Sequence, residues 1–431
     1  MRKLIKLIYA AIAFLWVLTP ASCISDDLSS SPADRPEFSA ESLDFGQVWA
    51  GEWSPAVAVT VYNRGSKVMR ITDVALSGVS GADVRLNVDG FSGQTFHDVD
   101  IRPGDSIAVL ADAFPEGKEI SGSIVFTVNG AVTSLPIAGE ALEPLTLRDM
   151  AVTADTRIEA GSLVRVFGCL DVRAGATLVV EEGATLCFHD GASLRVGGKL
   201  IVQGTSGRQV KLCGDRLGNV VTTIPFDLIP GQWEGIIADG GEVEMTCADL
   251  LNPVTGLSCG GGAQVRLDNC RLTNASRRVV DASASDLVAV GCEFSSSPEG
   301  VVTLSGGSAE ISRCTLADNY LFASSTGALL QLEDGAVASV SESIFYGVCP
   351  DLNPSAPDGS SFVRCTFRSN GSDDAIFVGC LWGCDPLFDI DAETYSYDYR
   401  LREGSPAEAI VCPVRTDRYG VSGTFPGAYN R

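Results

Sequence analysis

The chain is poor in histidine, the side chain that proteins use most often to hold zinc or to exchange protons near neutral pH. Its 431 residues include two histidines, His97 and His189. Each is isolated in the sequence, and a lone histidine is most often structural or simply exposed. Cys380 and Cys384 have a spacing that only weakly suggests a zinc site, and neither histidine is close to them in sequence. We therefore expect no metal site.

Long apolar runs are also missing. Beyond the first two dozen residues, no run approaches the roughly 20 apolar residues that cross a bilayer as a helix. The chain is nevertheless 45% hydrophobic and 20% charged, which is ordinary for a globular protein with a sizeable core. Its length suggests two or three folded units.

Positive charge is scarce. There are 31 Lys and Arg residues against 54 Asp and Glu, which gives a formal net charge of -23. Such a surface repels nucleic acid and anionic lipid, so we expect no nucleic-acid partner. It suits a solvated surface protein or one that depends on calcium.

The N-terminus has the pattern of an export signal. Arg2, Lys3 and Lys6 give a basic start, residues 7–18 are apolar, and small residues precede Cys23. This segment resembles the lipobox of bacterial lipoproteins, in which the cysteine is lipidated and becomes the first residue. Pro20 stands where that family usually has leucine, so ordinary cleavage after residue 21 or 22 is the alternative.

The residues after Cys23 extend this resemblance. Ser25, Asp26 and Asp27 resemble the acidic surface-export signal of Bacteroidota lipoproteins. The expected order is a signal peptide over 1–22, then a lipidated Cys23 and a flexible tether over 23–35. The resemblance implies a lipoprotein exposed on the cell outer membrane, with membrane contact through the lipid anchor alone.

Residues 36–143 alternate apolar and polar positions between Gly, Pro and Asn turns, which predicts an antiparallel β-sandwich. Asn129 and Gly130 lie between two apolar strands and predict a type I′ hairpin turn. Residues 43–46, 57–65 and 137–139 resemble immunoglobulin-like (Ig-like) domains of the hydin and major-sperm-protein type. That family implies a spacer or scaffold, and we find no catalytic chemistry in this region.

Two repeats dominate the rest of the chain. A Gly-Ala-Thr/Ser-Leu motif recurs every eight residues from Gly175 to Leu194. A Cys-x-apolar motif then recurs every 22 residues at Cys270, Cys292 and Cys314, with Ser343 and Cys365 in the same slot further on. We also place Cys247 in this slot, and we expect Asn274, Asn319 and Asn370 to form left-handed turns. A period near 22 residues predicts stacked coils of a parallel β-solenoid with ladders of like residues.

Residues 170–172, 181–183, 198–200 and 233–236 resemble the opening coils of the pectate-lyase-type right-handed parallel β-helix. The expected fold is therefore all-β: an N-terminal Ig-like β-sandwich, a right-handed parallel β-helix over 144–385 and a C-terminal capping segment over 386–431. This resemblance implies the fold and leaves the function open, because the same coils serve lyases, glycosidases and adhesins.

Thirteen cysteines lie from Cys169 onward, and we expect most of them to pack as buried thiols. Side chains in register on neighbouring strands are about 4.8 Å apart, further than a disulfide prefers. Cys380, Cys384 and Cys412 lie off the ladder, and one pair of them is a candidate disulfide.

No catalytic motif of the β-helix families matches, so the catalytic residues are unknown. Tyr320 and Tyr346 are candidates for stacking on sugars. Arg277 and Arg278 form the only basic doublet in the coils and are further candidates for ligand binding. The favoured hypothesis is a surface-anchored binding or adhesion protein that presents the β-helix to polysaccharides or to other envelope proteins. The alternative is a carbohydrate-active enzyme, either a polysaccharide lyase or a glycosidase. No cofactor is expected, except calcium if the protein is a lyase.

Overall fold

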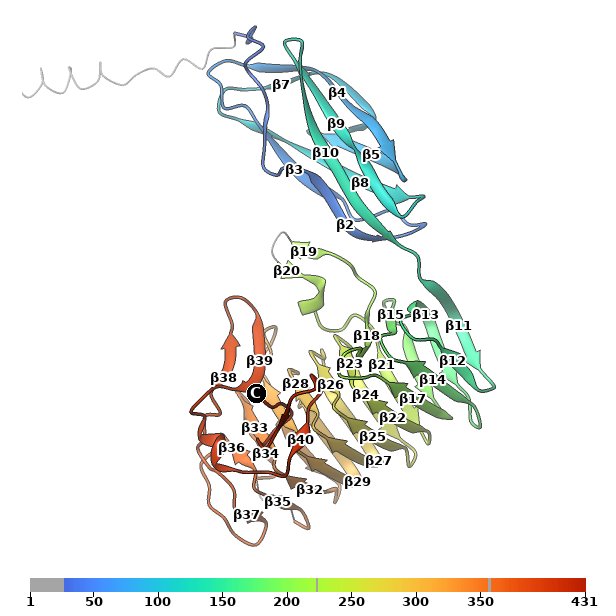
Figure 1. Ribbon diagram of the computed structural model, residues 1–431, viewed down its shortest axis with the longest axis vertical. Helices are drawn as coiled ribbons and strands as arrows, with labels where there is room; N and C mark the ends of the chain where they lie inside the picture. Colours follow the sequence, from blue (N-terminus) through green and yellow to red (C-terminus); the bar gives the residue numbers. More distant parts are fainter. Residues whose placement is uncertain (1–26, 222–223, 356–357) are drawn as a thin grey trace, which may run out of the picture. The chain divides into compact units, whose positions relative to one another are not determined.

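The structure is a computed structural model that describes residues 27–221, 224–355 and 358–431. The chain divides into two compact units, with the boundary between Glu143 and Pro144. Cys23 and the expected signal peptide lie outside the described residues. Each unit is built from strands, as the alternation and the repeats in the sequence predict (Figure 1).

The first unit is a β-sandwich of two five-stranded sheets. One sheet contains, in spatial order, β1 (Glu37–Phe38), β3 (Val57–Tyr62), β8 (Ser106–Pro115), β5 (Ala82–Val88) and β6 (Phe91–Gly93). The other contains β2 (Leu43–Trp49), β10 (Ala131–Leu142), β9 (Glu119–Val128), β4 (Met69–Ser80) and β7 (Thr95–Ile101). The pairs are antiparallel except that β2 runs parallel to β10, which the expectation of a purely antiparallel sandwich missed.

Local sequence explains the sandwich well. Asn129 and Gly130 both have positive φ angles, 49° and 77°, and join β9 to β10 as a type I′ turn requires. Residues just before the first strand also contact this unit. Ser29 donates its backbone N–H to Val68 O, and Asn129 donates to Ser31 O. The part of the expected tether from residue 27 onward therefore lies against the sandwich.

The second unit is a right-handed parallel β-helix whose 25-stranded sheet winds over three faces. Figure 1 shows its strands following one another along the solenoid. The strand β11 (Leu145–Val152) opens it and pairs with both halves of β13 (Leu163–Val172). Each later coil passes through the three faces in turn, so strands on one face come from successive coils.

The first face contains the first half of β13, β15 (Thr185–Phe188), β18 (Val210–Gly214), β23 (Ala248–Leu251), β26 (Arg271–Thr273), β28 (Glu293–Ser295), β30 (Thr315–Asp318), β33 (Ile344–Gly347) and β36 (Thr366–Phe367). The second contains the second half of β13, β16 (Ser193–Val196), β21 (Gly235–Asp239), β24 (Thr255–Gly260), the first parts of β27 (Arg278–Val290) and β29 (Val302–Ser312), β31 (Leu330–Glu333) and β34 (Leu352–Asn353). The third contains β12 (Thr156–Ile158), β14 (Thr177–Glu181), β17 (Lys199–Gln203), β22 (Glu242–Thr246), β25 (Gln264–Asp268), the later parts of β27 and β29, β32 (Val337–Ser341), β35 (Ser361–Val363) and β37 (Phe377–Val378).

Side-chain ladders form the core of the solenoid. Cys270, Cys292 and Cys314 stack in register at the start of the first face, fully buried, and Ser343 continues the row through a 3.1 Å hydrogen bond from the Cys314 amide. Two residues further along, an apolar ladder fills the interior with the side chains of Leu250, Leu272, Phe294, Leu316, Phe345 and Phe367. The predicted ladder is therefore confirmed for these coils.

Two details of the repeat assignment are wrong. Ala248 occupies the ladder slot before Cys270, because Asp249 pairs with Arg271, so Cys247 falls one residue early and adopts a positive φ of 45°. Asn274 has the expected left-handed backbone, but among the described residues neither Asn319 nor Asn370 does. Both of these asparagines precede longer loops, which need no tight turn.

The expected capping segment over 386–431, called the closing segment below, packs along the outer side of the first face. Phe388, Tyr399, Leu401 and Tyr429 join Ala317 and Ile344 in a separate apolar cluster. Its regular elements are β38 (Phe388–Asp391), β39 (Ser396–Leu401), the 3₁₀ helix η2 (Pro406–Ala409), β40 (Arg415–Thr416) and β41 (Ser422–Gly423). At the end of the solenoid itself, Trp382 stacks on Phe367 with a centroid distance of 4.7 Å.

All 13 cysteines from Cys169 onward are free thiols, including the three near the closing segment, Cys380, Cys384 and Cys412. Burial raises the pKa of the Cys259 thiol to about 12. It raises the pKa of the Cys412 thiol to about 12 as well. An unfolded thiol has a pKa of about 8.5, so the folded solenoid holds protons that the unfolded chain releases in mild alkali.

We predict that the free energy of unfolding of the solenoid falls as the pH rises above about 8.5. The raised thiol pKa values stabilise the fold only below the pKa of the unfolded thiol, and this contribution is lost as the pH increases. Urea unfolding monitored at pH 7 and pH 10 measures the effect. The described part of the sandwich unit has no cysteine, so its transition is the internal control. Equal shifts of the two transitions would contradict the prediction.

Candidate functional site

A cavity of the solenoid lies where the first face turns into the second. Most coils make this turn in a few residues: 252–254, 274–277 and 296–301. Two coils make it in long loops, 215–234 before the cavity and 319–329 after it. The first loop contains β19 (Asn219–Val221), β20 (Ile224–Pro225) and the 3₁₀ helix η1 (Phe226–Leu228). The short turns between the two loops leave a hollow on the outer face.

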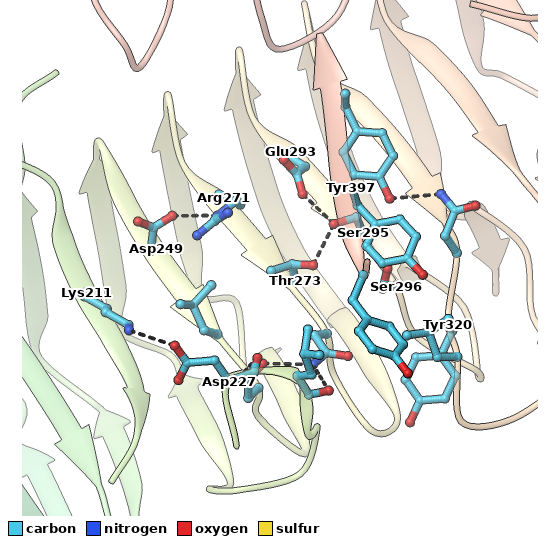
Figure 2. Close-up of a pocket in the computed structure, with 18 residues that line it drawn as sticks. Lys211, Asp227, Asp249, Arg271, Thr273, Glu293, Ser295, Ser296, Tyr320 and Tyr397 are labelled. Carbon is cyan, nitrogen blue, oxygen red and sulfur yellow. Dashed lines mark hydrogen bonds and ion pairs between the residues drawn. The ribbon is translucent and has the colours of Figure 1, made fainter. Parts of the chain in front are cut away.

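The hairpin formed by β38 and β39 provides another wall. Tyr395, Tyr397 and Tyr399 from this hairpin face the coils, and the resulting cavity has a volume of about 350 Å³. Figure 2 shows Tyr397 and Tyr320 on one side of it and Lys211 and Asp227 on the other. A volume of this size lies at the lower end of the range for small-molecule pockets.

The floor of the cavity is a ladder of alternating charge. Lys211, Asp249, Arg271 and Glu293 occupy the same outward position on β18, β23, β26 and β28. The Arg271 guanidinium donates to Asp249 over 2.8 Å. Burial disfavours the charged form of Arg271, but the neighbouring Asp249 and Glu293 outweigh this effect and raise its pKa. The ladder is therefore held together by its own ion pairs.

Residues of the closing segment also form hydrogen bonds with the carboxylates of this ladder. Arg418, with only 2% of its side chain exposed, donates to Asp249 over 2.7 Å. The Tyr429 hydroxyl donates to one carboxylate oxygen of Glu293, and Ser295 donates to the other over 2.6 Å. Because the single hydrogen of Ser295 is used on Glu293, its 2.7 Å contact with Thr273 requires Thr273 to be the donor. Glu293 is thus held on both sides.

The two asparagines in the short turns hold the first long loop against the coils. Asn252 donates to Asp227 O over 3.0 Å, and Asn274 donates to Leu228 O over 2.9 Å. The two amides also bond to each other over 2.9 Å. Both residues have a φ of 59°, a backbone conformation that asparagine tolerates better than most residues. These amides therefore fix the loop wall next to the charged floor.

The tyrosines supply the other side of the cavity. Burial raises the pKa of Tyr320 and also that of Tyr397, so both phenols stay protonated near neutral pH. Tyr399 is buried and accepts a hydrogen bond from Asn319 over 3.1 Å. The buried hydroxyl of Tyr397 has no hydrogen-bond partner among the described residues. Tyr395 and Leu321 also line the cavity and are exposed, and the exposed Phe322 packs edge-on against Tyr320.

The structure separates the four residues that the sequence singles out for binding. Tyr320 lines the cavity. Tyr346 instead packs edge-on against Phe388, with ring centroids 5.6 Å apart, beneath the closing segment. Arg277 pairs with Glu299 at 3.3 Å and Arg278 with Asp281 at 3.1 Å. None of these three lines the cavity formed by the described residues.

Sequence reasoning missed most of the lining, notably Arg271, Glu293, Tyr395 and Tyr397. A signal for its position was present. The ladder interval is 22 residues from Cys292 to Cys314 but 29 from Cys314 to Ser343, and this longer interval marks the loop that carries Tyr320. The hairpin tyrosines gave no such signal, because they come from beyond the repeats.

The hydrogen bonds of the Asp249 and Glu293 carboxylates suit a structural role better than a role in proton transfer. The register places Asp249 and Glu293 two strands apart, or about 10 Å, near the upper end of the separation used by inverting glycosidases. Asp249 accepts from Arg271 and Arg418, and Glu293 accepts from Tyr429 and Ser295. A general acid must exchange its proton with substrate, and Glu293 is only 5% exposed.

Comparison with known protein families finds none that matches the chain, and comparison with curated proteins finds no match. Within the described ranges, no group of three or more His, Cys, Asp or Glu side chains is placed to hold a metal ion. The same ranges contain no helix long and apolar enough to cross a membrane.

We predict that Arg418→Ala destabilises the solenoid by about 3–5 kcal/mol, because it leaves a largely buried charge network without one of its cations. Arg402→Ala is the matched control: its pair with Asp389 has both side chains more than half exposed, so we expect little change. Urea unfolding of the two variants measures both effects. An equal decrease in the free energy of unfolding in the two variants would show that the contact between Arg418 and Asp249 does not stabilise the solenoid.

Proposed function

We propose that the protein is a surface-anchored binding protein that holds a glycan in the cavity between the long loops and the β38–β39 hairpin. The observation that supports this best is the pairing of tyrosine side chains with a polar floor. Sugars present apolar C–H faces that stack on aromatic rings and hydroxyl groups that need hydrogen bonds. A cavity of about 350 Å³ fits the end of a chain or a short branch better than a long polymer.

Enzymatic cleavage of a polysaccharide is the second candidate, and the Asp249–Glu293 spacing is the observation in its favour. The partners that occupy both carboxylates favour binding instead. A reducing-end and unsaturated-product assay on a panel of plant and host polysaccharides, with and without calcium, separates the two. Product release would favour a glycosidase, and release abolished by EDTA would favour a calcium-dependent lyase.

We predict that Tyr320→Ala and Tyr397→Ala each weaken glycan binding by up to about tenfold, the loss expected when one aromatic contact is removed. Binding is measured on a glycan array and then by titration calorimetry with the oligosaccharides that score. Tyr62→Ala is the control, because Tyr62 lies in the sandwich and contacts Arg64. Circular dichroism checks that each variant is folded. Unchanged affinity in both cavity variants would remove the proposed site.

Anchoring through Cys23 is part of the same proposal and rests on the sequence alone. We predict that the protein enters the detergent phase on phase partitioning and that Cys23→Ser moves it to the aqueous phase, because the acyl chains supply the membrane affinity. Cys169→Ser is the control, since Cys169 lies in the first coils of the solenoid. Equal partitioning of the Cys23 variant and the native chain would exclude lipidation at this residue.

A further inference from the structure

The charged side chains around the cavity form ion pairs with one another. Lys211 and Arg271 line the cavity with Asp227, Asp249 and Glu293. Arg418 is not part of the lining but supplies a third cation to Asp249. Lys211 pairs with Asp227 at 3.9 Å, while Asp249 accepts from both arginines. Glu293 follows Arg271 in the ladder and is held by Tyr429 and Ser295. The cavity therefore presents no cation that lacks an acidic partner among the described residues.

A ligand carboxylate or sulfate would bind in this cavity with lower affinity than an uncharged group. A carboxylate that bound Arg271 would lie beside Asp249 and Glu293, the two carboxylates that flank this arginine in the ladder. In a partly buried site such like-charge contacts are costly.

Uncharged hydroxyl groups fit the same surface. Tyr397 lines the cavity, and its hydroxyl is buried away from the surface without a hydrogen-bond partner among the described residues. Tyr320 and the Thr273–Ser295 pair add hydroxyl groups nearby. A sugar hydroxyl both donates and accepts, as these groups require.

We propose that the cavity selects an uncharged sugar unit and discriminates against uronic and other acidic sugars. This inference rests on the proposed function and adds the chemical class of the ligand. The geometry that carries it is the self-paired charged floor, which lies in the same cavity as the uncharged side chains of Thr273, Ser295 and Tyr320.

The test uses matched pairs of oligosaccharides with gluco, galacto and manno configurations, each as the neutral chain and as the same chain oxidised at C6 to the uronate. Titration calorimetry of the full chain at low ionic strength should give at least tenfold tighter binding for the neutral member of a pair. Equal or tighter binding of the uronate would overturn this inference while leaving glycan binding intact. No binding of any member, with no effect of Tyr397→Ala on the glycan array, would overturn the proposed function itself.

A charge variant sharpens the test. Asp227→Asn removes the acidic partner of Lys211, so the ratio of the affinity for the neutral sugar to the affinity for the uronate should fall severalfold. Asp190→Asn is the matched control, because Asp190 forms a similarly long, exposed pair with Arg216 at 4.0 Å and does not line the cavity. An unchanged preference in the Asp227 variant would show that charge pairing does not set the selectivity.

Discussion

Stacking of one coil on the next is the interaction on which the solenoid depends. No coil can bury its inner face alone, so each ladder residue is buried by its counterparts in the coils before and after it. Cys292, for example, lies between Cys270 and Cys314, and Phe345 lies between Leu316 and Phe367. This constraint fixes the inward residues and leaves the outward ones free to vary. The charged floor of the cavity is built from that free set.

The repeats make the fold predictable because coil stacking imposes them on the sequence. The Cys-x-apolar period by itself predicts the coils and the ladder residues that fill their core. The error at Cys247 arises because alanine and cysteine are both small enough for the ladder slot, so the spacing of one further cysteine is not decisive. The parallel pairing of β2 with β10 depends on long-range topology, which alternation along a strand does not report.

The candidate site is predictable only in part, since it is formed where the repeats are interrupted. Tyr320 is found because aromatic rings can stack on sugars, whereas Tyr346 meets the same criterion in sequence but is covered by Phe388. Arg271 and Glu293 occupy ordinary outward positions, and only the register between coils shows that they are neighbours. Tyr397 reaches the cavity from a position 104 residues beyond Glu293 in the chain.

The contacts between the closing segment and the middle coils also determine when the cavity is completed during synthesis. Coils can stack one at a time as the chain emerges, because each contacts mainly its neighbours. The wall formed by Tyr395 and Tyr397, and the bonds from Arg418 to Asp249 and from Tyr429 to Glu293, form only after the closing segment has been made. An emerging chain that lacks this segment therefore has a stacked solenoid without a finished cavity, so the proposed ligand could bind only after the closing segment is in place.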